Sequence, residues 1–406
     1  MNILVFNCGS SSLKYRLLDM PKGVERAGGE AQRVGPPTAK PSVIFHHARG
    51  KKESFETPMR SHGEAFVEVM KLLHRDADLT PGAVGHRLVH GGTLFSEPTV
   101  VDANVLSRLE QVRDMAPLHN PPAMALMQAC HERFPDLPQV AVFDTAFHAT
   151  IPAHARTYAL PLRLRQELGI RKYGFHGTSH QFVMEEAAAF LGTPLELFNA
   201  VSCHLGSGGA SLCAIRNGQS VDNTMGYSPL QGLVMSTRCG DLDPALAMNL
   251  LTRAGGDCAQ VEKLLNNRSG VLGMSGSTAD IRDVLASTSQ TETWTVRLDH
   301  TAQVYLWRLR KYLGAYLAVV GNARAVIFTD TIGETVPAVR WGLCSGMEAF
   351  GLKMDAGLNA KVASLPADVA ADDSRIRILV VQTNEELAIA RRTYGALQTQ
   401  VVKAED

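Results

Sequence analysis

Residues 2–18 read NILVFNCGSSSLKYRLL, and the fold can be inferred from this segment. It begins with an apolar run, continues through small polar residues at positions 7–12, and ends in alternating apolar and polar residues. Such a pattern predicts a buried strand, a tight turn and a second strand, which together form a β-hairpin. Residues 199–215 read NAVSCHLGSGGASLCAI and repeat the pattern about half a chain later. The two hairpins indicate a duplicated architecture, with a chance likeness of two tight turns as the alternative.

Strands and helices alternate along the rest of the chain. A β-branched run at residues 325–329 predicts a further strand that ends in a loop. A loop that starts at Ile151-Pro152 suggests a domain boundary near residue 150. This alternation predicts the α/β class. Helices are predicted at residues 63–75, 121–133, 293–320 and 385–398, and weakly structured stretches at 21–41 and 364–374.

Composition limits the classes of function. The chain has 406 residues, enough for two domains, and its 40 Lys plus Arg balance 40 Asp plus Glu. The balance gives no reason to expect a nucleic acid or a membrane as partner, and no apolar run approaches the roughly 18 residues of a membrane helix. An unpaired, scattered cysteine set predicts reduced thiols and a cytoplasmic protein. The seven are Cys8, Cys130, Cys203, Cys213, Cys239, Cys258 and Cys344.

Small-residue turns and two arginines are the candidate binding elements. The chain lacks G-x-x-x-x-G-K-[ST], G-x-S-x-G and H-E-x-x-H motifs, so phosphate would have to bind at the Gly/Ser hairpin tips. A plain tight turn is the alternative. Arg87 and Arg238 lie in glycine-containing segments, where a rigid guanidinium suits carboxylate or phosphate, or forms a structural ion pair.

Histidine spacing motivates a rival class of protein. His86 and His90, and likewise His176 and His180, are four residues apart, which on a helix suits a zinc hydrolase. Against this reading, residues 84–89 alternate like a strand, and glycines on both sides of His176 disfavour a helix there.

Nine stretches in order along the chain resemble one known family. They are NCGSSSLK (7–14), GHRLVHGG (85–92), APLHNPP (116–122), FDTAFH (143–148), YGFHGTSH (173–180), residues 225–244, residues 269–283, CSGME (344–348) and TNEEL (383–387). Together they resemble the acetate kinase family of the actin-like sugar-kinase superfamily. The resemblance implies an α/β fold of two actin-like, ribonuclease H-like domains of duplicated βββαβαβα type, with an interdomain active-site cleft. The implied domains are 1–149 plus 383–406, and 150–382, the latter binding nucleotide.

The resemblance also implies a reaction and its site residues. The reaction is the reversible transfer of a phosphoryl group between ATP and acetate, which gives acetyl phosphate and ADP, in a cytoplasmic homodimer that uses Mg²⁺, with Mn²⁺ as an alternative ion. Asn7 and Glu385 match the metal site. The implied catalytic residues are Arg87, Asp144, His176 and Arg238, and the acetate site consists of Arg87, Val89, Leu118, Phe175 and Pro229. The implied nucleotide contacts are Ser10, Ser12, Lys14, His204, Gly206, Ser207, Gly208, Asp280, Ile281, Arg282, Thr331, Ile332, Gly333, Glu334 and Thr335.

Two nucleotide loops depart from the family pattern. Residues 204–211 are one residue longer than the family loop and lack its Asn, and residues 328–335 carry Asp330 and Thr331 where the family keeps glycine. A threonine is strained if that position requires a positive φ. Gln231 stands where the family commonly has Glu. The loops could still bind ATP, the donor could be pyrophosphate, or the chain could be a weakened binding or regulatory homologue. Propionate is an alternative substrate.

Overall fold

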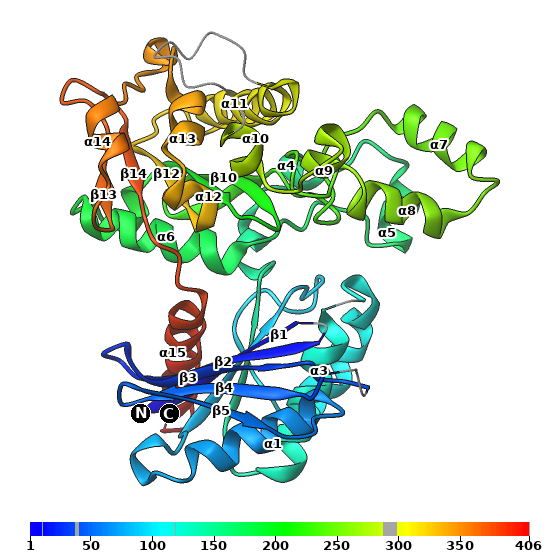
Figure 1. Ribbon diagram of the computed structural model, residues 1–406, viewed down its shortest axis with the longest axis vertical. Helices are drawn as coiled ribbons and strands as arrows, with labels where there is room; N and C mark the ends of the chain where they lie inside the picture. The colour runs from blue at the N-terminus through cyan, green and yellow to red at the C-terminus, as the bar shows by residue number, and fades with distance from the viewer. Residues whose placement is uncertain (10, 37–39, 118, 287–298, 406) are drawn as a thin grey trace. The chain divides into compact units, whose positions relative to one another are not determined.

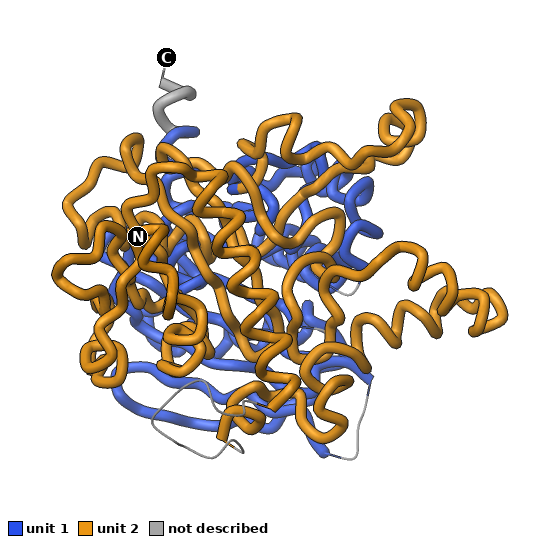
Figure 2. The backbone as a smooth tube through the Cα atoms, turned by 90° about the horizontal axis from the view of Figure 1, so that it is seen from above, with its two compact units in different colours: residues 1–147, 384–406 blue, residues 148–383 orange. Residues whose placement is uncertain are grey.

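The computed structural model describes residues 1–9, 11–36, 40–117, 119–286 and 299–405, and places them in two compact units. Unit 1 consists of Met1–Phe147 and Asn384–Asp406, and unit 2 of His148–Thr383 (Figure 2). Three expectations fall outside the described residues: Ser10, Leu118 and the first part of the helix predicted at 293–320. Among the described helices, none combines the length and the apolar character that crossing a membrane requires.

Unit 1 is built on an eight-stranded sheet with the order β5-β4-β3-β2-β1-β6-β8-β7 (Figure 1). The predicted first hairpin is confirmed, because β1 and β2 pair antiparallel from Asn2↔Asp19 to Cys8↔Leu13. The strands are β1 (Asn2–Cys8), β2 (Ser12–Asp19), β3 (Val24–Gln32), β4 (Val43–Ala48), β5 (Lys51–Glu56), β6 (Ala83–Leu88), β7 (Thr99–Val100) and β8 (Gln139–Phe143). The helices are α1 (His62–Leu73), α2 (Ala103–Leu109), α3 (Asn120–Arg133) and α15 (Glu385–Glu405).

Successive residues of β1 bury their side chains on opposite faces of this sheet, as strand geometry requires. Ile3 and Val5 join the cluster that contains Ile389 and Ala390 of α15. Phe6 joins the cluster that contains Phe66 of α1. A helix therefore covers each face of β1, which explains why residues 3–6 read as a continuous apolar run.

Unit 2 is built on a six-stranded sheet with the order β11-β10-β9-β12-β14-β13. Its first two strands form the second predicted hairpin, with Ala210↔Leu205 nearest the turn. The strands are β9 (Ala200–Leu205), β10 (Ala210–Arg216), β11 (Gln219–Asn223), β12 (Ala325–Thr329), β13 (Ala367–Asp368) and β14 (Arg377–Val380). The helices are α4 (Ala153–Arg156), α5 (Leu162–Glu167), α6 (Gly177–Phe190), α7 (Pro244–Arg253), α8 (Cys258–Asn267), α9 (Gly270–Ser275), α10 (Ile281–Ala286), α11 (His300–Val320), α12 (Asp330–Thr335), α13 (Pro337–Cys344) and α14 (Ala356–Ala360).

The two sheets share one strand plan. In unit 1, three antiparallel strands (β3-β2-β1) are followed by two strands that continue parallel to β1 (β6 and β8). In unit 2, β11-β10-β9 are followed in the same way by β12 and β14. The predicted α/β fold with a duplicated architecture is therefore confirmed, because an accidental likeness of two turns would not reproduce the order and direction of five strands.

Two local predictions were wrong. Residues 21–41 were expected to be weakly structured, but β3 pairs with β2 from Val24 to Gln32, so sheet pairing overrides the poor strand propensity of Gly28 and Gly29. Glycine is needed at position 29, where a Cβ would lie 2.1 Å from the Phe45 carbonyl oxygen. The loop expected after residue 329 is the short helix α12.

Candidate active site

Unit 1 gathers polar side chains at the carboxyl ends of three parallel strands. Asn7 lies near the end of β1, Arg87 is the second-last residue of β6, and Asp144 directly follows β8. The parallel registers Phe6↔His86 and Leu88↔Phe143 align these ends. In open α/β sheets this edge is where ligands bind.

Arg87 is the centre of this cluster. Its Nε and Nη2 donate to the Asp144 carboxylate, with the shortest distance 2.7 Å from Nη2 to Oδ2. Its Nη1 lies 3.3 Å from Asn7 Oδ1 and 3.3 Å from Glu385 Oε2, at the start of α15. Burial alone would lower the pKa of Arg87, but Asp144 and Glu385 more than offset it and raise the pKa. Two predicted catalytic residues and both predicted metal residues therefore meet around one guanidinium.

The oxygen atoms of Asn7 and Glu385 suit a hard divalent cation. Mg²⁺ binds carboxylate and amide oxygens, usually through one or two protein ligands together with water and substrate phosphate. Both oxygens approach the same Arg87 nitrogen, so they lie near each other. Within the described parts of the chain, no group of three or more His, Cys, Asp or Glu side chains could hold a metal ion. The donor set therefore fits a sparsely ligated Mg²⁺ and gives the zinc alternative no supporting cluster.

Asn120 supports this edge of unit 1 and was not predicted. Its Nδ2 donates to the His90 carbonyl at 2.9 Å, and its Oδ1 accepts from the His90 N–H at 3.2 Å. The buried amide thereby fixes the loop after β6, next to Arg87. The segment 116–122 was recognised as a motif, but the residues alone gave no reason to choose Asn120.

Ser12 and Lys14, two of the predicted phosphate-binding residues, lie at the start of β2, next to the tip of the first hairpin. Lys14 is exposed on β2 and pairs with Asn7 in the register, which places both side chains on one face of the sheet. The Ser12 carbonyl accepts from the Gly9 N–H at 2.9 Å and closes the turn.

In unit 2, His176 occupies a left-handed position, with φ 58°, immediately before α6. The flanking glycines were expected to disfavour a helix here, but α6 starts at Gly177 itself and contains His180. His176 Nδ1 lies 2.9 Å from Ser211 Oγ, and His180 Nε2 lies 2.8 Å from the same oxygen. The four-residue spacing of these histidines therefore reflects a shared serine partner.

Gly209 allows Arg238 and His176 to approach the turn between β9 and β10. A Cβ at Gly209 would lie 3.4 Å from Arg238 Nη1 and 3.4 Å from His176 Cε1. Within the described residues, the guanidinium has no carboxylate partner, and its hydrogen bond goes to Met235 Sδ at 3.7 Å. Burial lowers the pKa of Arg238, as expected when no counter-charge offsets desolvation. A half-buried arginine without a counter-ion, beside a glycine-rich turn, is suited to hold an anionic ligand.

The two unusual loops are linked to each other. His204 Nε2 lies 3.0 Å from Asp330 Oδ2, and the Ser207 N–H donates to Thr331 Oγ1 at 2.9 Å. Asp330 takes the positive φ of 64°, whereas Thr331 is helical, so the strain anticipated for the threonine does not arise. An aspartate tolerates the left-handed region better than a β-branched residue does.

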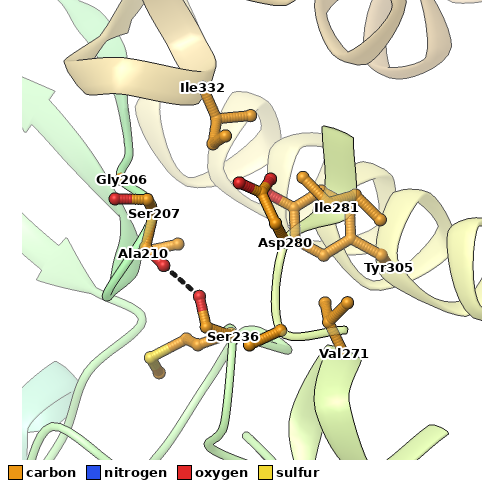
Figure 3. Close-up of a pocket in the computed structure, with 11 residues that line it drawn as sticks. Gly206, Ser207, Ala210, Ser236, Val271, Asp280, Ile281, Tyr305 and Ile332 are labelled. Carbon is orange, nitrogen blue, oxygen red and sulfur yellow. Dashed lines mark hydrogen bonds between the residues drawn. The ribbon is translucent and has the colours of Figure 1, made fainter. Parts of the chain in front are cut away.

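Some of the remaining predicted nucleotide contacts line a pocket, and the others lie in the segments around it. Gly206, Ser207, Asp280, Ile281 and Ile332 line one small pocket of unit 2 (Figure 3). Its cavity volume is about 10 Å³, room for no more than about one water molecule. Three other predicted contacts make hydrogen bonds or ion pairs with residues around the pocket. Glu334 Oε1 accepts from the Asp330 N–H, and the Gly333 carbonyl accepts from Arg340. The exposed Arg282 pairs with Asp280. Gly208 and Thr335 are exposed.

The residues predicted to hold the acetate methyl group are distributed over both units. Val89 is half-buried in unit 1, Phe175 is buried and Pro229 half-buried in unit 2, and Leu118 lies outside the described residues. Gln231 Oε1 accepts a hydrogen bond from the Tyr158 hydroxyl. This bond anchors the segment that carries Pro229.

The repeated strand plan, with polar clusters at the strand ends, defines a mixed α/β protein of the actin-like two-domain fold. A family model described as the acetokinase family matches residues 2–391, and the chain belongs to this family. It is 42% identical to the acetate kinase of Dictyoglomus turgidum, with 99% of each chain covered. It is similar to the crystal structure of Porphyromonas gingivalis acetate kinase, with a TM-score of 0.89, 36% identity, and coverage of 98% of this chain and 99% of that one. A propionate kinase from Francisella tularensis gives a TM-score of 0.86 and 34% identity, with 97% and 99% covered.

Proposed function

We propose that this protein is an acetate kinase, which reversibly transfers a phosphoryl group between ATP and acetate with the help of Mg²⁺. The observation that carries the proposal is Arg238, a half-buried guanidinium without a carboxylate partner among the described residues, beside His176 and the turn at Gly209. Family membership supports the same assignment. We further infer that the protein is cytoplasmic and homodimeric, as the family resemblance implies.

The chemical difficulty of this reaction is charge repulsion. Acetate is an anion at neutral pH, and it must approach a phosphoryl group that is also negative. Two unit charges at about 4 Å repel by roughly 4 kcal/mol at an effective dielectric of about 20. The guanidinium groups of Arg87 and Arg238 offset that repulsion and stabilise the charge on the equatorial oxygens in the transition state.

The other residues orient these charges. Asp144 forms an ion pair with Arg87 and is only 2% exposed. Because acetate needs no general base, the role of Asp144 is to fix the direction of the guanidinium. His176, held by Ser211, stabilises the transferring phosphoryl group. Asn7 and Glu385 would hold Mg²⁺, which neutralises phosphate charge when bound.

Substrate size is expected to be selected weakly. Val89, Leu118, Phe175 and Pro229 are proposed to contact the methyl group of acetate. One methylene group is worth only about 1–3 kcal/mol in an apolar pocket. We therefore expect propionate to react more slowly than acetate but measurably, and butyrate to have a lower specificity constant than either.

The alternative function differs in the phosphoryl donor, which would be pyrophosphate instead of ATP. Pyrophosphate is the alternative donor, because residues 204–211 and 328–335, where a nucleotide is expected to bind, both depart from the family pattern. Purified protein with acetate, magnesium and either donor separates the two, with acetyl phosphate trapped as its hydroxamate. We expect product with ATP. Product with pyrophosphate alone would favour the alternative, and product with neither would leave a binding or regulatory role.

A further inference from the structure

Two backbone N–H groups, one at the β9–β10 turn and one in the first turn of α12, are satisfied by side chains of α12. The Ser207 N–H donates to Thr331 Oγ1 at 2.9 Å, and the Thr331 N–H donates to Asp330 Oδ1 at 2.6 Å. These residues follow β9 and β12, which are parallel neighbours with Thr329↔His204 in register. A small-residue turn at the carboxyl end of parallel strands is where backbone N–H groups hold anions. Here the protein's own oxygen atoms occupy those donors.

The Asp330 carboxylate lies inside this turn. Its Oδ2 lies 3.0 Å from His204 Nε2, and a Cβ at Gly206 would lie 2.3 Å from the same oxygen. Burial raises the pKa of Asp330, but the hydrogen bond to His204, the charge of His204 and the hydrogen bonds with Thr331 together lower it more, so the net pKa is below the ordinary value. The negatively charged carboxylate of Asp330 therefore occupies the place at the turn where an anionic ligand could bind.

The same turn is tied down on its other side. The Ser236 hydroxyl donates to the Ser207 carbonyl (Figure 3), and the Gly206 N–H donates to the Gly209 carbonyl at 2.9 Å. Together with the side chains of α12, these bonds leave the adjoining pocket about 10 Å³. Rotation about the side-chain bonds of Asp330, Thr331 and Ser236 would release their contacts with the turn, whereas the Gly206–Gly209 backbone bond would remain.

We propose that Asp330 and Thr331 form an internal cap, which competes with the polyphosphate of the donor for the Ser207 and Thr331 amides. The inference rests on the proposed function, because that function supplies the polyphosphate. When the donor binds, its phosphate oxygens replace the Asp330 carboxylate and the Thr331 hydroxyl. The cap therefore sets the affinity for the donor, and an anion that cannot displace a carboxylate is excluded.

The test is equilibrium binding of MgATP and of magnesium tripolyphosphate, measured by calorimetry on the full chain. D330G removes the competing carboxylate, and glycine accepts the φ of 64° at this position without strain. We expect D330G to bind both ligands at least threefold more tightly than the wild type, a modest fraction of what a charged hydrogen bond is worth. T331A, which frees the Ser207 amide, is expected to tighten binding in the same direction. N217G is the matched control, because Asn217 also has a positive φ, of 51°, but lies at the β10–β11 turn.

Steady-state kinetics distinguishes the loss of the cap from a general loosening of the structure, because only the loss of the cap would lower the KM for ATP. In D330G the KM for ATP should fall at least threefold, while the KM for acetate stays within twofold. Unchanged or weaker MgATP binding in D330G and T331A would overturn the inference, as would no binding by any variant, or tightening for MgATP but not for tripolyphosphate. A wild type that binds MgATP yet makes no acetyl phosphate would instead contradict the proposed function, and the titrations would still decide on the cap.

Discussion

At the scale of single residues, the two arginines differ in their surroundings. Arg87 is held by Asp144 and Glu385 at 2.7 and 3.3 Å, whereas Arg238 meets no carboxylate within the described part of the chain. An arginine locked between two acids is pre-oriented, and a partly buried arginine without a counter-ion attracts an anion. The unpaired group should therefore make the larger direct contribution to holding the transferring phosphoryl group.

Arg238→Ala should lower kcat by about two orders of magnitude or more, the scale of losing one electrostatic stabiliser of a transition state. The measurement is the initial rate of acetyl phosphate formation at saturating acetate and MgATP. Arg253→Ala, which removes an exposed arginine of α7, is the control and should retain wild-type turnover. A turnover number for Arg238→Ala within a factor of ten of the wild type would show that the role is misassigned.

His86, next to Arg87, should make unit 1 sensitive to acid. It is 1% exposed, and burial lowers its pKa to about 4, although the hydrogen bond with Gln139 acts in the opposite direction. Between about pH 4 and 6.5 the unfolded chain binds a proton here that the folded chain does not. Stability therefore falls as the pH drops through this range, by up to about 3 kcal/mol.

His86→Leu should flatten this pH dependence. The measurement is the urea midpoint of unfolding at pH 5 and pH 7, compared as a difference within each variant. His74→Leu, which removes an exposed imidazole at the end of α1, should keep the wild-type difference. Equal differences in His86→Leu and the wild type would exclude His86 as the source.

At the scale of elements, α15 packs on the sheet of unit 1 through close contact with a glycine of β6. A Cβ at Gly85 would lie 2.5 Å from Thr393 Oγ1 and 2.9 Å from Ile389 Cγ2. Only glycine lets the helix approach this strand so closely. The contact is one of those that bind the C-terminal segment to the sheet, and it holds the helix that begins at Glu385.

Gly85→Ala should lower the free energy of unfolding by about 1–3 kcal/mol, because the added methyl group overpacks the interface. Gly395→Ala lies on the same helix with no atom within 4 Å of the added Cβ, and should raise stability by roughly 0.5–1 kcal/mol. Denaturant unfolding gives both values. Combining Gly85→Ala with Thr393→Ala should recover part of the loss, and equal stability of Gly85→Ala and the wild type would contradict the packing argument.

Both hairpins and most of the long helices could be predicted from the sequence, because each is specified by its own periodicity and turn residues. The helix expected at 121–133 is α3 (Asn120–Arg133), and that at 63–75 is α1 (His62–Leu73). Strand β3 and helix α12 could not be predicted in this way. Their signals lie in neighbours distant in the sequence: β2 for the first, and the β9–β10 turn for the second.

At the scale of the whole molecule, the duplicated strand plan explains why each unit has a polar cluster at equivalent strand ends. Asn7, Arg87 and Asp144 lie at the carboxyl ends of β1, β6 and β8, as Gly206 and Asp330 lie at those of β9 and β12. The Arg87 cluster was identified by resemblance and is assembled by the parallel register. The pair His204–Asp330 could not be read from the sequence, because two distant residues meet only through sheet pairing.

Reversible phosphoryl transfer between a nucleotide and a carboxylate can be measured in the direction of ATP synthesis. Purified protein is mixed with acetyl phosphate, ADP and Mg²⁺, and the phosphorus species are followed by ³¹P NMR. We expect acetyl phosphate to disappear and the γ-phosphate of ATP to appear at equal rates. Release of inorganic phosphate without ATP, or unchanged acetyl phosphate, would contradict it.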